Sequence, residues 1–172
     1  MNISKLLLIL TTVVLTSCYF FPFVLEVLPM TNSKMILAAF GLVIFGINLA
    51  KNGNAEIDFG FTKLTAWALG VSLISYASIT INNTPDDTFV TYFISTWVWL
   101  SGAYSVIIFI KHVHGEVSIP LVVNYLLAVC VMQCTLALIF DNNVVATEWH
   151  ASTFAGEGYM GNTDKNRLHG IG

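Results

Sequence analysis

Long apolar runs, separated by short charged or polar breaks, dominate the pattern along this chain. Three uncharged stretches follow one another at residues 64–85, 88–110 and 117–140, and they are 22, 23 and 24 residues long. A helix needs about 20 mostly apolar residues to cross the hydrocarbon core of a bilayer. Each stretch therefore predicts one membrane-spanning helix. We expect these three spans near residues 64–81, 90–110 and 118–140.

Two further spans are predicted before them. Lys5 is followed by 20 uncharged residues, and Pro29 with the polar residues after it ends this apolar run. The first span is therefore expected near 6–28. A second span is expected near 34–50, where 16 uncharged residues lie between two lysines. This run crosses the bilayer if both lysines extend their ammonium groups outward from its ends.

These patterns predict an all-α integral membrane protein with about five transmembrane helices. Lipid offers no water to the backbone, so a spanning segment must satisfy its own hydrogen bonds, and a helix does this locally. A β-barrel would need short segments of alternating polarity instead of long continuous apolar runs. We expect a transmembrane region over residues 1–140. A polar, loop-rich tail is expected over 141–172, with a short interfacial helix around 144–155.

Composition supports a membrane protein and excludes several other classes. Apolar residues make up 56 % of the 172 residues and charged residues 10 %, against about 25 % charged residues in soluble domains. The net charge of −3 provides no basic field for nucleic acid. The three cysteines have neither disulfide-framework nor zinc-site spacing. The lipid bilayer is therefore the expected partner, and no nucleic acid, metal or cofactor is expected.

The placement of lysines predicts the orientation. With the N-terminus in the cytoplasm, the outer loops hold Lys34 alone, in agreement with the positive-inside rule. Five spans then place the tail outside. The inner side holds Lys5, Lys51, Lys63 and Lys111.

The N-terminus also allows a different interpretation. Residues 15–18, Leu-Thr-Ser-Cys, have the form of a lipoprotein processing box, and Lys5 and an apolar run precede them, as in a secretory signal. The apolar run continues through Phe23, however, whereas mature lipoproteins usually turn polar after the cysteine. An uncleaved first span is favoured, and cleavage with lipidation at Cys18 is the alternative.

Polar and small residues inside the spans predict how the helices pack. The amides of Asn48, Asn124 and Gln133 are expected to form hydrogen bonds across helices. Small residues four positions apart let two helices approach closely. Two such pairs are Ala66 with Gly70 and Ser101 with Ser105.

Titratable residues near the span ends are candidates for chemistry. Glu26 lies near the outer end of the first span, and a carboxylate inside a membrane is a functional candidate by default. A shallow position would instead leave it solvated at the interface. His112 and His114 are two residues apart and do not share a helix face. Contact with lipid headgroups is therefore expected of them in place of metal binding.

Polar residues also converge in the tail, which holds the single arginine of the chain, Arg167. A guanidinium binds phosphate through two parallel hydrogen bonds and keeps its charge. Arg167 is therefore the candidate for binding a lipid diphosphate at the outer face. Lys165 and His169 are weaker candidates, and an ordinary solvated arginine is the alternative.

Two segments give the chain a resemblance to a known family. The first joins residues 72–76 (Ser-Leu-Ile-Ser-Tyr) and 82–84 (Asn-Asn-Thr) to 97–100 (Trp-Val-Trp-Leu). The second, Asn-Arg-Leu-His-Gly-Ile-Gly at 166–172, is similar to an Arg-Leu-x-Gly element that precedes a further membrane span. Over residues 34–172 the chain resembles the N-terminal part of bacterial O-antigen ligases and polymerases, the lipid A core–O-antigen ligase family.

The resemblance implies a glycan transferase in the inner membrane of a bacterium. In this family a glycan carried on undecaprenyl diphosphate moves to an acceptor sugar without a metal, and arginines stabilise the departing diphosphate. Arg167 matches a family element, whereas no catalytic residue is assigned, neither His150 nor His169. The resemblance also implies further spans and a large outer loop beyond this sequence, without which the chain is expected to be inactive. Ligase and polymerase are not distinguished.

A non-enzymatic role is the alternative. A five-span protein of this size also fits a small membrane subunit, such as a transporter, channel or immunity component. The spans lack the charged relays expected of a pump, which weakens the transporter version.

Overall fold

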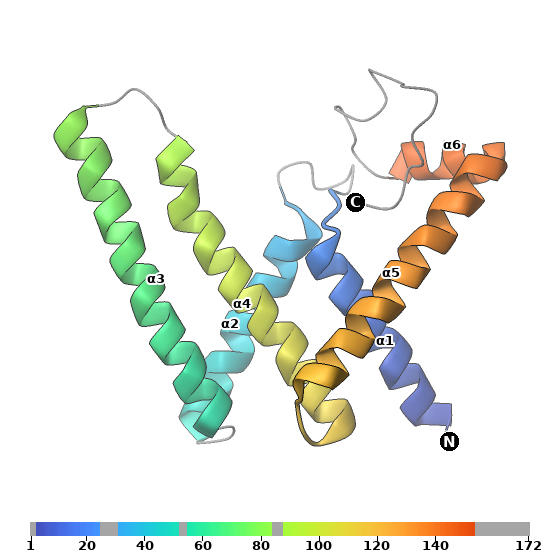
Figure 1. The fold of residues 1–172 in the computed structure, drawn as a ribbon, viewed down its shortest axis with the longest axis horizontal. Helices are drawn as coiled ribbons and strands as arrows, with labels where there is room; N and C mark the ends of the chain where they lie inside the picture. The colour runs from blue at the N-terminus through green and yellow to red at the C-terminus, as the bar shows by residue number, and fades with distance from the viewer. Residues whose placement is uncertain (1–2, 25–30, 52–54, 84–87, 154–172) are drawn as a thin grey trace. The chain divides into compact units, whose positions relative to one another are not determined.

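Helices account for the named elements in the described part of the chain. The computed structural model describes residues 3–24, 31–51, 55–83 and 88–153. The helices found in these ranges (Figure 1) are α1 (Ile3–Phe20), α2 (Ser33–Lys51), α3 (Ala55–Asn82), α4 (Thr88–His114), α5 (Ile119–Asn142) and α6 (Val144–Thr153).

Five of these helices contain segments long and apolar enough to cross a membrane. This confirms the predicted all-α membrane fold. Helix α6 has 10 residues, too few to span a bilayer, and it lies within the segment where a short helix was expected. The five apolar segments are Ile3–Phe20, Ser33–Lys51, Phe59–Asn82, Ile94–His114 and Ile119–Asn142.

The helix ends differ from the ends of the predicted spans. Helix α1 stops at Phe20, before the expected end at residue 28. The physical reason is Pro22, which has no N–H to donate and disfavours the helical conformation of the residue before it. Helix α3, in contrast, begins at Ala55 and continues through Lys63. Charged residues do not stop a helix, so apolar runs define spans better than helix ends.

The helices form two compact units. Unit 1 comprises residues 1–36 and 106–172, and unit 2 comprises residues 37–105. Unit 1 therefore contains α1, the first turn of α2, the last turns of α4, and α5 and α6. Unit 2 contains α3 and the remaining parts of α2 and α4.

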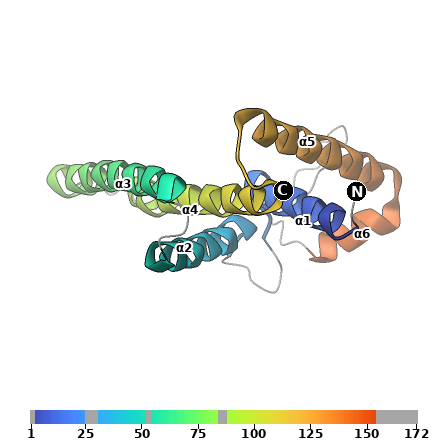
Figure 2. The ribbon, with the colours of Figure 1, turned by 90° about the horizontal axis from the view of Figure 1, so that it is seen from below.

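In unit 1, α1 packs directly against α5, and α6 packs against α5 in turn (Figure 2). The apolar core combines Val106 and Ile110 of α4 with Tyr125 of α5. Ile110 and Val129 are completely buried. The last turns of α4 and the first half of α5 therefore share one core.

In unit 2, the backbones of α2 and α4 are in contact. A Cβ atom added at Gly41 would lie 2.0 Å from the carbonyl oxygen of Ser101. Ser101 and Ser105 are completely buried, as expected of a small-residue pair. The expectation for the other pair is wrong. Ala66 is exposed, and nothing among the described residues lies within 4 Å of a Cβ placed at Gly70, so this face of α3 points outward.

An aromatic cluster of Phe45, Phe61 and Tyr104 joins α2, α3 and α4. The ring centroids of Phe61 and Tyr104 are 4.6 Å apart, those of Phe45 and Phe61 4.8 Å, and those of Phe45 and Tyr104 5.6 Å. The Asn48 side-chain amide donates a hydrogen bond to the Tyr104 hydroxyl at 3.1 Å. The predicted cross-helix bond of Asn48 is therefore confirmed.

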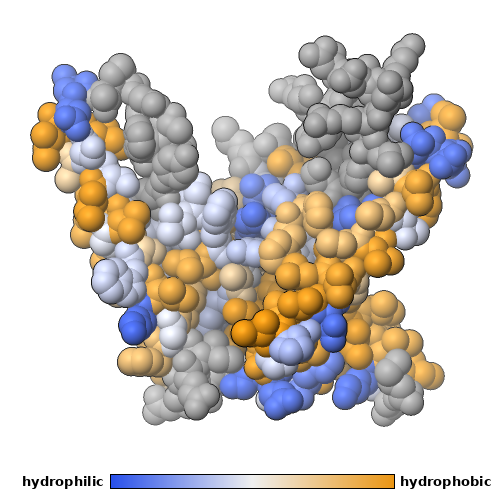
Figure 3. Space-filling view, in the orientation of Figure 1, coloured by the Kyte–Doolittle hydropathy of each residue, from blue (hydrophilic) through white to orange (hydrophobic). Residues whose placement is uncertain are grey.

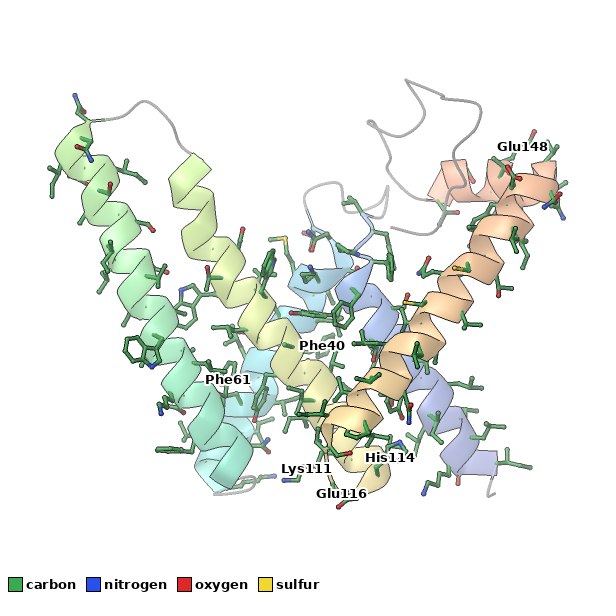
Figure 4. The ribbon with its side chains drawn as sticks, in the orientation of Figure 1. Phe40, Phe61, Lys111, His114, Glu116 and Glu148 are labelled. Atoms are coloured by element: carbon green, nitrogen blue, oxygen red, sulfur yellow. The ribbon has the colours of Figure 1, made fainter. Side chains whose placement is uncertain are left out.

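The outward-facing side chains of the spans are largely apolar. Phe40 (labelled in Figure 4), Trp67, Ile74 and Val131 are each more than half exposed. Figure 3 shows hydrophobic side chains over the middle of α5 and hydrophilic ones near the turn between α4 and α5. Apolar surface exposed on this scale is unfavourable in water and is matched by lipid.

Candidate functional site

The candidate residues for binding a diphosphate, and Glu26, lie outside the described part of the chain. Arg167, Lys165 and His169 fall within 154–172, and Glu26 falls within 25–30. His150 lies in α6, but its side chain is also outside the described set. The structure therefore describes α5 and α6, which precede Arg167 in the chain, and α1 and α2, which come before and after Glu26.

A polar seam runs between α1 and α5, formed by Thr12, Thr16, Ser17, Tyr125 and Gln133, all of them buried. The Gln133 amide donates a hydrogen bond to the Ser17 hydroxyl at 2.8 Å. The hydroxyls of Thr12 and Thr16 donate to backbone carbonyls of their own helix at 2.8 and 2.7 Å. The Gln133–Ser17 bond therefore links the two spans, whereas these threonine bonds stay within α1.

The Gln133 bond confirms a second cross-helix prediction. Asn124, the third amide, is exposed on α5 and forms no hydrogen bond among the described residues, so the expectation for it is wrong. We predict that Gln133→Leu and Ser17→Ala are not additive. Their coupling should be about 0.6 kcal/mol, the average for bonds between membrane helices, with an upper bound of about 1.7 kcal/mol.

The measurement for this pair is a double-mutant cycle on unfolding in detergent micelles. Thr135→Ala is the matched control, because Thr135 is exposed on the same helix and its hydroxyl bonds to its own backbone at Val131. Full additivity of Gln133→Leu and Ser17→Ala would contradict a bond that stabilises the α1–α5 contact.

The turn between α4 and α5 is fixed by a side-chain contact. His114 Nε2 lies 2.9 Å from the Tyr125 hydroxyl, and the two rings meet edge to face with centroids 5.7 Å apart. Gly115 adopts φ +82° and donates its N–H to the carbonyl of Lys111 at 2.7 Å, a helix end that favours glycine. His114, Lys111 and the exposed Glu116 are labelled in Figure 4. His114 therefore makes an internal contact with α5, and its expected contact with lipid headgroups stays a prediction.

A hydrogen-bonded clasp closes the segment between α1 and α2 at its base. The Ser33 hydroxyl donates to the carbonyl of Cys18 at 2.8 Å and accepts from the N–H of Phe23 at 3.2 Å. The Ser33 N–H donates to the Phe23 carbonyl at 2.9 Å, and Val24 pairs with Asn32 in an isolated antiparallel bridge. The clasp therefore holds the residues that follow α1 beside the start of α2.

Lys34 lies directly beside the clasp. Its ammonium is 5.1 Å from the centre of the Tyr19 ring, within the range of a cation–π contact. The Asn32 carboxamide oxygen accepts the Met35 N–H at 2.9 Å and so caps the start of α2. These contacts hold a positive charge at the end of the first two spans. The sequence placed Lys34 there but gave no sign of the contact with Tyr19.

The position of Cys18 bears on the lipoprotein alternative. Cys18 lies inside α1, and its carbonyl belongs to the clasp. Cleavage before Cys18 would remove Thr12, Thr16 and Ser17, the whole α1 side of the polar seam. This cost to the fold favours the uncleaved first span.

Unit 2 holds buried polar groups without a hydrogen-bond partner among the described residues. They are the hydroxyls of Ser72, Ser101 and Ser105 and the indole N–H of Trp97. Trp97, Ser101 and Ser105 are four residues apart in turn, so they follow one side of α4. For metals, the described ranges contain no group of three or more His, Cys, Asp or Glu side chains able to hold an ion.

Comparison with other proteins gives no match: no protein-family model, curated protein or solved structure is similar to this chain.

Proposed function

We propose that this chain is the membrane-embedded N-terminal part of a glycan transferase in the bacterial inner membrane. The whole transferase moves a glycan from undecaprenyl diphosphate to an acceptor sugar. The observation that supports the proposal is the position at which α5 ends. Helix α5 is apolar enough to span the bilayer and ends at Asn142, so the segment with Arg167 starts at the membrane boundary, where a lipid diphosphate lies.

The span order also supports one common polar side. Successive spans alternate in direction, so the end of α1, the start of α2 and the end of α5 face the same side of the membrane. That side holds the clasp with Lys34, the segment with Glu26 and the tail with Arg167. The lysine distribution indicates that this side faces the outside, where the proposed transfer of the lipid-linked glycan takes place.

In the proposed reaction the diphosphate is the leaving group. The acceptor hydroxyl attacks the anomeric carbon of the carried sugar while the bond from that carbon to the diphosphate oxygen breaks. A fixed cation lowers the barrier because negative charge grows on the departing oxygen. The guanidinium of Arg167 supplies the fixed positive charge and donates two parallel hydrogen bonds to the diphosphate. A general base takes the proton of the acceptor hydroxyl, and its identity stays unassigned.

The test is glycan transfer in membranes of host cells that carry single variants in the intact gene. Arg167→Ala should abolish transfer, and Arg167→Lys should fail to restore it, because lysine lacks the bidentate fork. Thr163→Ala is the matched control in the same segment, because no binding role is proposed for Thr163, and it should retain most of the transfer.

Protein amounts must be equal across these strains. Normal transfer by Arg167→Ala would overturn the role of Arg167. Normal transfer in a strain that lacks the gene would overturn the proposed function and favour a small non-enzymatic membrane subunit.

A further inference from the structure

We infer that α6 lies in the headgroup region of the membrane, at the end of α5, and inserts an apolar edge made of Val144, Val145 and Trp149. This inference is independent of the proposed function. Val144 and Val145 are each 73 % exposed and Trp149 is 55 % exposed. These are large values for apolar side chains on a helix that carries ordered contacts on its other side.

The contacts between α5 and α6 fix the position of α6 relative to the end of α5. The Asn143 side-chain oxygen accepts the N–H groups of Val145 and Ala146 at 3.1 and 3.3 Å. The Thr147 hydroxyl donates to the carbonyl of Phe140 in the last turn of α5. Helix α6 is therefore capped by Asn143, the residue that follows α5, and bonded to the final turn of α5. Figure 1 shows α6 running across the end of α5.

The length of α5 places its final turn at the membrane boundary. A helix of 24 residues is roughly 36 Å long at 1.5 Å per residue, and the hydrocarbon core is about 30 Å thick. Leu138 and Ile139, just before this turn, are 55 % and 46 % exposed, so the lipid-facing surface of α5 continues to its end.

The residue types on α6 match the headgroup region better than any other surroundings. Val145 and Trp149 are four residues apart and share a face, and Val144 and Glu148 share the next one. The hydrocarbon core would penalise Glu148, and water would penalise the two valines. The interface accepts both kinds of group, and tryptophan is enriched there. A free helix of 10 residues is marginal in water, so binding to the interface also explains why α6 forms.

The consequence is a fixed depth for the end of α6. Thr153, its last residue, lies in the headgroup layer, beside the lipid phosphates.

The test is the depth of Trp149, measured by fluorescence quenching in phosphatidylcholine vesicles that contain the full chain. The vesicles carry a nitroxide at carbon 5 or carbon 12 of the acyl chain, and iodide serves as the aqueous quencher. The difference between the wild-type protein and Trp149→Phe isolates the signal of Trp149. This exposed substitution leaves the packed core untouched, and a variant with Trp149 as its sole tryptophan provides a second measurement.

For Trp149 we expect about twofold stronger quenching from carbon 5 than from carbon 12, because interfacial helices bury their apolar face only about 5–10 Å into the headgroup and acyl boundary. Trp67 is the matched control, because it is 70 % exposed on α3 away from the helix ends, and its Trp67→Phe difference should favour carbon 12. Full quenching of Trp149 by iodide with none from lipid would overturn the inference and place α6 in water. Protection of Trp149 from all three quenchers would overturn the inference by showing that protein covers the side chain. Stronger quenching from carbon 12 than from carbon 5 would overturn it by showing that Trp149 lies in the hydrocarbon core.

Discussion

Replacing Gly41 with alanine is expected to destabilise unit 2 by at least about 2–3 kcal/mol, the upper range for overpacking a close contact. The added Cβ atom would lie 2.0 Å from the carbonyl oxygen and 2.9 Å from the carbonyl carbon of Ser101. Both atoms belong to the backbone, so no side-chain rotation can relieve the clash. Helices α2 and α4 must move apart, and contacts along both helices weaken with them.

Gly46→Ala is the matched control for Gly41→Ala. Gly46 lies in the same helix, and no described atom is within 4 Å of a Cβ placed there. Alanine at this position should be neutral or stabilising by about 0.5–1 kcal/mol through helix propensity. The measurement is unfolding of both variants in the same detergent. Equal stability of Gly41→Ala and Gly46→Ala would show that the close approach of α2 and α4 is wrong.

Replacing Tyr104 with alanine is expected to cost about 3–5 kcal/mol of folding free energy, as for other buried aromatic residues. Tyr104 is 2 % exposed, and its ring contacts both Phe61 and Phe45. Its removal leaves a cavity where three helices meet. It also leaves the Asn48 amide without the hydroxyl that accepts its hydrogen bond.

Tyr104→Phe separates these two effects. It keeps the ring contacts and removes the hydroxyl, so it should cost about 0.6 kcal/mol, the average for a hydrogen bond between membrane helices. Unfolding of both variants in detergent provides the comparison. A loss for Tyr104→Phe as large as that for Tyr104→Ala would mean that the hydrogen bond, and not the aromatic cluster, holds the three helices.

The sequence predicted the helical class well because apolar runs bounded by charge define spans almost directly. It also predicted which amides would bond for Asn48 and Gln133, since hydrocarbon leaves a buried amide few alternatives. It failed for Asn124, which faces outward, and for the pair of Ala66 and Gly70. A span that is apolar on every side carries no amphipathic stripe, so its pattern does not tell which face meets a neighbour.

The candidate site was less predictable for a different reason. The clasp at Ser33 depends on the chain returning to Cys18 and Phe23, and the contact of Lys34 with Tyr19 depends on that return. Neither pairing has a local sequence signature. The tail residue Arg167 was proposed from its chemistry and from a resemblance to a family element, and it lies outside the described residues.

Apolar side chains face outward from the spans, and small or polar side chains lie buried between the helices. This distribution has a consequence for how the sequence diverges over evolution. Most outward positions of the spans contact lipid, where one aliphatic residue substitutes for another at little cost. The positions that resist change are small or polar, such as Gly41, Ser101, Ser17 and Gln133. Homologues should therefore drift rapidly in overall identity while keeping this sparse set. A glycine facing a serine, and a serine facing a glutamine, would identify a relative better than any long stretch of similar sequence.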